Sequence, residues 1–174
     1  MGTRPSRFGR PGIWKSLFGD TSDQDSWKSL PVETVSWIDV CGQENWTTGF
    51  LNKVSGGAIS GDCFHLPTEA QWEYACRAGA SGNSFNLRSL AWYDDNSGGQ
   101  THPVGQKQAN AWGLYDMQGN VWEWCADWYE NYPSGVSTDP AGPSLGSGRV
   151  VRGGSWYNIA NSCRFAYRGY SGPF

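Results

Sequence analysis

The sequence predicts one α+β domain, spanning residues 1–174, in which two helices and several short strands are joined by long ordered loops. Three observations indicate this class. The chain has 24 glycines and 11 tryptophans among its 174 residues, it has few long aliphatic runs, and two segments carry helix start signals. Glycine favours turns and positive φ values, whereas tryptophan buries a large area on one side chain. We therefore expect aromatic anchors, rather than regular layers, to stabilise the core.

The first expected elements are a short strand and a helix. Pro31–Val35 is typical of a short strand, and Ser36 then begins a helix, because its hydroxyl can cap free backbone N–H groups. Asp39 places an acid in the first turn of this helix, where the helix dipole favours it. Gly56-Gly57 would end the helix. Its apolar face would contain Trp46, Phe50 and Val54.

The second helix shows the clearest local pattern. Thr68 follows a proline and precedes Gln71 by three residues, which matches a capping box. Gly79 is a natural stop, because glycine readily takes the left-handed conformation that ends helices. We therefore predict a helix from Thr68 to Ala78. Its apolar positions recur at helical spacing and comprise Trp72, Ala75, Cys76 and Gly79.

Beyond Gly79 the pattern changes to short aromatic clusters separated by glycine, serine and asparagine. No cluster keeps helical spacing over two turns, so we expect short strands and ordered loops. Arg149–Arg152 is typical of a strand. We expect the Gly153-Gly154-Ser155 phrase that follows it to form a tight bend, which lets the chain approach the core.

Composition and charge exclude several classes of function. The 13 basic and 16 acidic residues give a net charge of −3 without a basic stripe, so nucleic acid is not the expected partner. No apolar window of about 18 residues predicts a membrane helix, and no apolar run near the N-terminus predicts a signal peptide, which leaves a cytoplasmic location by default. An odd count of five cysteines without a visible signal peptide argues against a disulfide framework, and two histidines cannot form a histidine-rich metal site.

Four phrases, taken in order, carry a family resemblance. They are PVETVSW at 31–37, LPTEAQWEYA at 66–75, NAWGLYDMQGNVWEW at 110–124 and RVVRGGSW at 149–156. This set resembles the formylglycine-generating-enzyme, or sulfatase-modifying-factor, family over nearly the whole chain. The resemblance implies a C-type-lectin-like α+β fold with two helices, small twisted antiparallel sheets and little other regular structure.

The two ends of the sequence differ from the family pattern. Family domains usually begin with an earlier strand and end with a later one, these two strands pair, and neither phrase is present here. The resemblance therefore predicts exposed sheet edges, which are sites for pairing with another chain. We expect either a trimmed domain or a domain whose edges are covered by a partner chain or in a homo-oligomer.

The resemblance also implies a calcium site in the turn that contains Asp116 and Glu123. In the family, the side chains at these two positions and the backbone carbonyls at Gly119 and Val121 bind the ion. Carboxylate and carbonyl oxygens suit hard cations such as Ca²⁺, which here would stabilise a loop with a thin core. The alternative is that Asp116 and Glu123 only cap turns and accept hydrogen bonds from indole N–H groups.

The oxidase chemistry of the family requires two cysteines, five residues apart after a Gly-Gly-Ser phrase, which hold copper(I). Counting from Ser155 places Asn158 at the first position and Cys163 at the second, so Cys163 is the sole candidate catalytic residue. One cysteine cannot form a two-thiolate site, and copper is therefore not expected as a cofactor. The shorter spacing of non-oxidase members takes Cys163 out of register, and we predict that it is a small buried hydrophobic side chain.

We therefore expect a sulfatase-modifying-factor-like domain without the catalytic cysteine pair, acting as a binding module for a protein, peptide or sugar. In this fold the segment after Gly-Gly-Ser lines the ligand face, and aromatic, amide and guanidinium groups suit such ligands. Core packing and salt bridging are the alternative roles for these side chains. The rival functions are a formylglycine-generating oxidase that acts on a sulfatase cysteine, and a trimmed remnant without function. The candidate ligand-binding residues are Trp156, Tyr157, Asn158, Asn161, Arg164 and Arg168.

Overall fold

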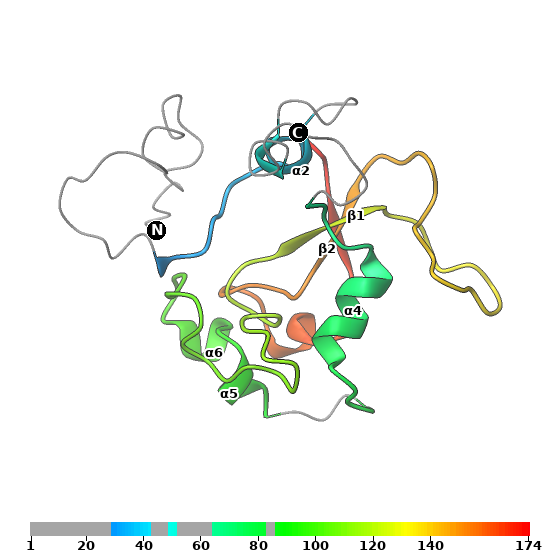
Figure 1. Ribbon diagram of the computed structural model, residues 1–174. Coiled ribbons are helices and arrows are strands. Elements are labelled where there is room, and N and C mark those ends of the chain that lie inside the picture. Colours follow the sequence, from blue (N-terminus) through cyan, green and yellow to red (C-terminus); the bar gives the residue numbers. More distant parts are fainter. Residues whose placement is uncertain (1–28, 43–48, 52–63, 83–85) are drawn as a thin grey trace.

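The computed structural model describes residues 29–42, 49–51, 64–82 and 86–174 (Figure 1). Short helices and one small antiparallel sheet are joined by long loops, which confirms the predicted α+β class. None of the described helices is long and apolar enough to cross a membrane. In chain order, the elements are α2 (Trp37–Cys41), α4 (Glu69–Arg77), α5 (Leu87–Leu90), α6 (Asp94–Ser97), β1 (Glu123–Trp128), β2 (Arg149–Arg152), the 3-10 helix η3 (Ala160–Cys163) and β3 (Gly169–Ser171).

Helix α2 begins where the sequence predicts but ends much earlier. The Ser36 hydroxyl accepts a hydrogen bond from the Asp39 backbone N–H at 3.1 Å, and the Asp39 carboxylate accepts one from the Ser36 N–H at 2.9 Å. Gly42 then ends the helix with a φ of 87°, a value that favours glycine. The prediction of one continuous helix to Gly56 is therefore wrong at Gly42. Most of its later part, 43–48 and 52–56, lies outside the described residues.

The predicted strand at Pro31–Val35 is also wrong, because this segment is irregular. Thr34 takes a φ of 59°, which is incompatible with an extended strand. The Val35 carbonyl accepts a hydrogen bond from the indole N–H of Trp124 at 3.0 Å, across 89 positions of the chain. A side chain, rather than a β ladder, therefore attaches this segment to the sheet.

The capping box of α4 forms as predicted. Thr68 Oγ1 accepts a hydrogen bond from the Gln71 N–H at 3.2 Å, and Gln71 Oε1 accepts one from the Thr68 N–H at 2.9 Å. The helix ends at Arg77, and Ala78 takes the left-handed conformation immediately before Gly79. The predicted second helix is therefore confirmed to within one residue at each end.

The sheet has the order β1-β2-β3, with antiparallel neighbours. Because alternate residues of a strand point to opposite sides, its two faces carry different side chains. On the face toward α4, Cys125 and Val150 join a buried core cluster. The other face presents Trp124, Val151 and Gly169, which lie opposite one another across the three strands. The cluster on the α4 face is completed by Trp72, Cys76 and Phe165.

Helix α2 covers one end of the second face. Trp37 donates its indole N–H to the Cys125 carbonyl at 3.0 Å. The Arg149 guanidinium lies 3.8 Å from the Trp37 ring centroid and 3.6 Å from that of Trp128. It also donates to the Ala126 carbonyl at 2.6 Å, so this stacked cation fills that end of the face. Figure 1 shows α2 beside the C-terminus of the chain, away from α4.

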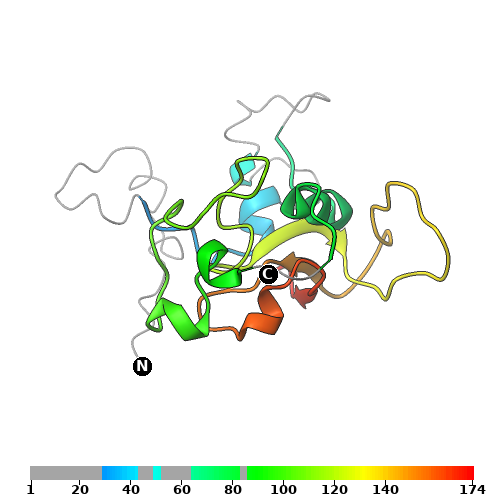
Figure 2. The same cartoon turned by 90° about the horizontal axis from the view of Figure 1, so that it is seen from below.

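A second buried cluster lies at the other end of the molecule, where α5, α6 and η3 gather (Figure 1). Its members include Ala91, Tyr93 and Cys163. Gly154 lets the chain approach this cluster, because a Cβ at this position would lie 2.6 Å from Cys163 Sγ. Its φ of 76° also favours glycine, and the predicted tight bend after β2 is therefore confirmed. The 129–148 loop projects from the opposite side of the molecule (Figure 2).

A buried ion-pair network attaches α4 to β2. The Arg152 side chain is fully buried, and its guanidinium donates to the Tyr167 carbonyl at 2.9 Å. It also forms ion pairs with Glu69, at 3.3 Å, and with Glu73. Arg168 binds the same Glu69 carboxylate through Nε and Nη2, each at 2.6 Å. These pairs offset much of the free-energy cost of burying charged groups.

Candidate functional site

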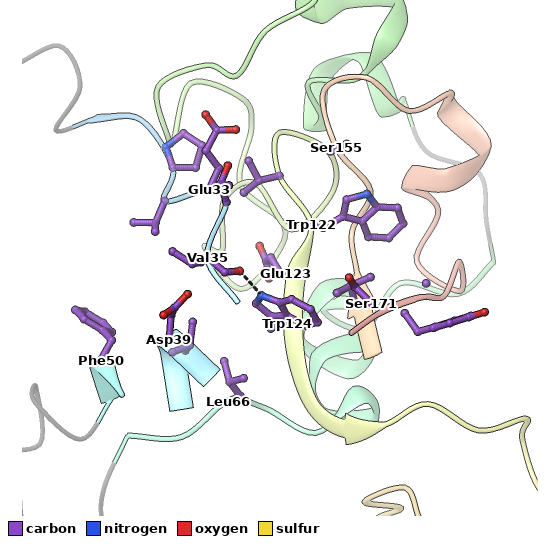
Figure 3. A pocket seen from close by; sticks show the side chains of 18 of the residues that line it. Glu33, Val35, Asp39, Phe50, Leu66, Trp122, Glu123, Trp124, Ser155 and Ser171 are labelled. Carbon is purple, nitrogen blue, oxygen red and sulfur yellow. Dashed lines mark hydrogen bonds between the residues drawn. The ribbon is translucent and has the colours of Figure 1, made fainter. Parts of the chain in front are cut away.

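A groove of about 940 Å³ opens over the second face of the sheet (Figure 3). We call it the sheet-face groove. Its floor contains the row of Trp124, Val151 and Gly169, and a Cβ on that glycine would lie 3.0 Å from a Val151 methyl carbon. The irregular 31–35 segment forms one wall, and residues 155–157, which follow the glycine bend, line it as well. Further lining side chains include Leu66, Pro67, Trp122, Tyr167 and Tyr170.

The structure brings two of the six candidate ligand residues to the sheet-face groove. Trp156 and Tyr157 line it, and their rings meet edge to face with centroids 5.3 Å apart. Tyr157 is 58% exposed, so much of its ring is accessible to a ligand. The Asn158 amide oxygen instead accepts a hydrogen bond from the Ser155 hydroxyl at 2.6 Å. Its side chain therefore stabilises the bend and is not among the residues that line the groove.

The other three candidates lie elsewhere. Asn161 belongs to η3, Arg164 follows it, and the Arg164 Nε–H donates to the Asn161 carbonyl at 3.0 Å. Arg168 lines a second groove of about 690 Å³, between α4 and the 129–148 loop. There its guanidinium lies 3.9 Å from the Tyr132 ring centroid while it pairs with Glu69. The salt-bridge alternative thus describes Arg168. The six candidates are divided between two grooves, the bend at Asn158 and the segment at η3 and Arg164.

The sheet-face groove also contains residues that the sequence analysis did not assign to a ligand. Glu33, Trp122 and Trp124 line it, and all three come from phrases that carry the family resemblance. The Trp122 ring lies 6.1 Å, centroid to centroid, from the ring of Tyr167. The spacing of the two tryptophans could have indicated this role, because residues two apart in extended backbone point to the same side, and Trp122 directly precedes β1.

The Asp116 and Glu123 carboxylates line a small cavity of about 310 Å³, together with Val121. Asp116 Oδ2 accepts a hydrogen bond from the Gly105 N–H at 2.7 Å, while its buried Oδ1 has no hydrogen-bond partner among the described residues. Glu123 Oε2 accepts one from the Trp72 indole N–H at 2.6 Å. Burial raises the pKa of Glu123 to about 7. The Trp72 hydrogen bond opposes this rise, and the charge of Asp116 adds to it.

These contacts fit a hard cation. A buried carboxylate oxygen without a partner is unfavourable, and a cation would both satisfy it and relieve the repulsion between the two carboxylates. The alternative of turn capping and indole hydrogen bonds describes Glu123 and one oxygen of Asp116, but it leaves Asp116 Oδ1 without a partner among the described residues. Gly119 bridges to Trp92 and is not among the residues that line this cavity. Within the described ranges no group of three or more His, Cys, Asp or Glu side chains could hold a metal, so a cation here would need additional backbone or water oxygens.

Cys163 lies in the second buried cluster with no exposed surface. Burial raises the pKa of its thiol to about 11, although hydrogen bonds from the Ser155 and Gly119 backbone oppose the rise. A thiol with such a pKa is protonated at neutral pH, whereas copper(I) prefers thiolate ligands. Asn158, at the other position that the oxidase chemistry requires, carries an amide that bonds to Ser155. These contacts support the interpretation of Cys163 as a small buried hydrophobic side chain.

Comparison with known proteins gives the family of the chain. Residues 9–174 match the family described as sulfatase-modifying factor enzyme 1-like domain. The formylglycine-generating enzyme of Streptomyces coelicolor is 32% identical over 192 residues, which cover 94% of this chain and 55% of that protein. The chaperone protein LppX of Paenibacillus barcinonensis is 30% identical over 203 residues, which cover 90% of this chain and 69% of that protein.

A solved structure agrees with these relatives. Treponema denticola variable protein 1 superimposes with a TM-score of 0.73 at 31% identity, over 92% of this chain and 75% of that one. The chain spans about half the length of the Streptomyces enzyme that it matches. The resemblance inferred from the four phrases is therefore confirmed, and the chain belongs to the family of sulfatase-modifying factor enzyme 1-like domains.

Proposed function

We propose that the domain is a non-oxidase binding module that holds a protein or peptide segment in the sheet-face groove. The observation that carries the proposal is the concentration of aromatic side chains around this groove, with Trp156 and Tyr157 among them. A contiguous apolar surface with a few polar groups is typical of binding sites. Tryptophan and tyrosine supply large rigid contact areas, which dominate the binding energy of many interfaces.

The state of the cysteines supports the same proposal. The described cysteines are free thiols and all are buried, and burial raises the pKa of each thiol. None of them therefore offers the surface thiolate that copper(I) chemistry needs. Cys63 lies outside the described residues. The matched relatives include proteins named as formylglycine-generating enzymes and one named as a chaperone, so membership of the family does not by itself imply oxidase activity.

Calcium has a structural role in this proposal. The side chains of Asp116 and Glu123, with the backbone carbonyl at Val121, would hold the ion, whereas Gly119 is not among the residues that line the cavity. Glu123 lines both the small cavity and the sheet-face groove. An ion at this position would therefore stabilise the start of β1 beside the groove, and bound Ca²⁺ would supply only charge and fixed geometry.

A peptide array tests the proposed function. Labelled protein is incubated with immobilised 15-residue peptides of varied sequence, and we expect selective retention on a subset of them. The double substitution Trp122→Ala and Tyr157→Ala should abolish this retention, because both side chains line the groove. Tyr74→Ala is the matched control, since Tyr74 is 68% exposed but lines the second groove. Retention that is absent, or that survives the double substitution, contradicts the proposal.

The proposal also allows a second copy of the chain as the partner. β3 is the outer strand of the described sheet, and an outer strand can pair with another chain. Light scattering over a range of protein concentrations measures this directly. A molar mass that stays at 19.1 kDa would restrict the partner to a different protein.

A further inference from the structure

The charges around the sheet-face groove are one-sided. Its described lining residues include three acids, Glu33, Asp39 and Glu123, and no Lys, Arg or His. The whole chain, in contrast, carries 13 basic residues against 16 acidic ones. The imbalance is therefore a local property of this groove rather than a consequence of the overall composition.

The two acids of the 31–40 segment supply the charge that a ligand would meet. Glu123 accepts a hydrogen bond from Trp72 and faces Asp116, so it belongs to the candidate cation site. Asp39 is exposed, although one of its oxygens caps α2. Burial raises the pKa of Glu33, and no charged neighbour contributes to that shift. Glu33 is therefore a partly buried carboxylate with no compensating cation close by in the described part of the chain.

Aromatic rings lie across the groove from these acids. Figure 3 shows Glu33 and Asp39 on one side and Trp122 and Ser171 on the other. The faces of indole and phenol rings attract cations, and they pack equally well against alkyl chains. A lysine or arginine side chain satisfies both properties, because its stem is apolar and its end is charged.

We propose that the sheet-face groove selects a peptide segment of a partner protein that combines apolar side chains with lysine or arginine. The inference rests on the proposed function, because it names the ligand chemistry of the same site. Apolar side chains contact the floor at Trp124, Val151 and Gly169, and the basic groups lie near Glu33 and Asp39. An acidic segment meets carboxylates of its own sign and is rejected.

Three labelled 12-residue peptides test the selection by fluorescence anisotropy. Leucine alternates with lysine in the first, with glutamate in the second and with serine in the third. We expect the Leu/Lys peptide to bind about tenfold tighter than the Leu/Glu peptide, with the Leu/Ser peptide between them. The preference should shrink as salt rises from 50 to 500 mM, because exposed charges are screened within about one Debye length of roughly 10 Å or less.

Charge-reversal variants test which acidic residue causes the preference for the Leu/Lys peptide. Glu33→Lys should remove most of the discrimination between the Leu/Lys and Leu/Glu peptides. Glu130→Lys is the matched control, because Glu130 is exposed and lines the second groove, and it should leave the discrimination unchanged. Equal binding of the two charged peptides, or discrimination that survives Glu33→Lys, overturns the inference.

The same experiment separates the two proposals. If the three peptides bind equally and Tyr157→Ala weakens their binding, the groove is a peptide site without charge selection and only this inference fails. If none of the three peptides binds, both the inference and the proposed peptide-binding function fail.

Discussion

The two faces of the three-stranded sheet are made of alternate residues of the same strands, yet only one of them is closed. On the α4 face, fully buried Arg152 pairs with Glu69 and Glu73, and a buried cluster fills the remaining space. On the other face, Trp124 and Val151 border a groove whose described lining residues include acids and no base. The comparison teaches that the two faces of this small domain differ in their packing: one face stabilises the fold, and the other carries the groove that we propose binds a ligand.

Loss of the buried cation should produce the largest effect on the α4 face. Arg152→Met removes a fully buried cation from both Glu69 and Glu73, because the methionine carries no charge. Glu69 then keeps only Arg168, and Glu73 keeps only Arg77. We expect a loss of about 3–5 kcal/mol in the free energy of unfolding, measured by urea denaturation. Arg164→Met is the control and should cost less than about 1 kcal/mol, because Arg164 is half-buried and bonds to a backbone carbonyl. Similar losses for the two variants would show that the buried ion pairs of Arg152 stabilise the protein no more than the hydrogen bond of Arg164 does.

The pH dependence of the stability of metal-free protein should report the ionisation of Glu123. This residue bonds to Trp72 and also lines the sheet-face groove. Burial raises the pKa of Glu123 from its ordinary value of 4.5 to about 7, so the folded state holds this proton more tightly than the unfolded state. Its contribution is fully present below pH 4.5 and is lost as the pH rises through about 7. The change is on the order of 3 kcal/mol. Urea denaturation in chelator between pH 4.5 and 8 measures it.

A substituted protein isolates the contribution of this carboxyl group. Glu123→Gln keeps a group that accepts the Trp72 indole hydrogen bond but does not titrate in this range. We expect a flatter stability profile between pH 4.5 and 8 in this variant than in the unaltered protein. An identical slope in both proteins would contradict the assignment of the titration to Glu123.

Calcium should stabilise the protein by a smaller amount through the same pair of carboxylates. At a free concentration 100 times the Kd, a ligand that binds only the folded state adds about 2.7 kcal/mol. We therefore expect the Tm to fall when excess chelator is added and to recover with Ca²⁺. Asp116→Asn should remove this response, because it removes the negative charge of a carboxylate that has an unpartnered buried oxygen. A Tm that does not change when chelator is added would contradict the proposed cation site.

Truncation of the groove wall should have the smallest effect on stability. Tyr157→Ala removes a ring that is 58% exposed, and we expect a change within about 0.5 kcal/mol in the free energy of unfolding. Its peptide affinity should nevertheless fall by about tenfold, because exposed aromatic rings at binding sites contribute mainly to affinity. Anisotropy and urea denaturation on the same sample separate the two effects. A large loss of stability would show instead that Tyr157 stabilises the fold.

Local patterns in the sequence predict the elements whose signals lie within a few residues. The Thr68 and Gln71 capping box predicts α4, and Ser36 with Asp39 predicts the start of α2. The sequence does not predict the end of α2 at Gly42, because an apolar helical spacing continues beyond this glycine. The strand expected at Pro31–Val35 failed for a similar reason, since nothing in its composition indicates that Thr34 takes a positive φ.

The sequence by itself therefore determined the α+β class, the family, the helix caps and the glycine bend beside Cys163. Only the tertiary structure decided that Trp156 and Tyr157 share a groove with Glu33 and Trp122, and that Arg168 belongs to a second groove with Glu69. The physical reason is the range of the interactions. A helix cap acts over three residues, whereas the hydrogen bond between Trp124 and Val35 spans 89 and the ion pair between Arg168 and Glu69 spans 99.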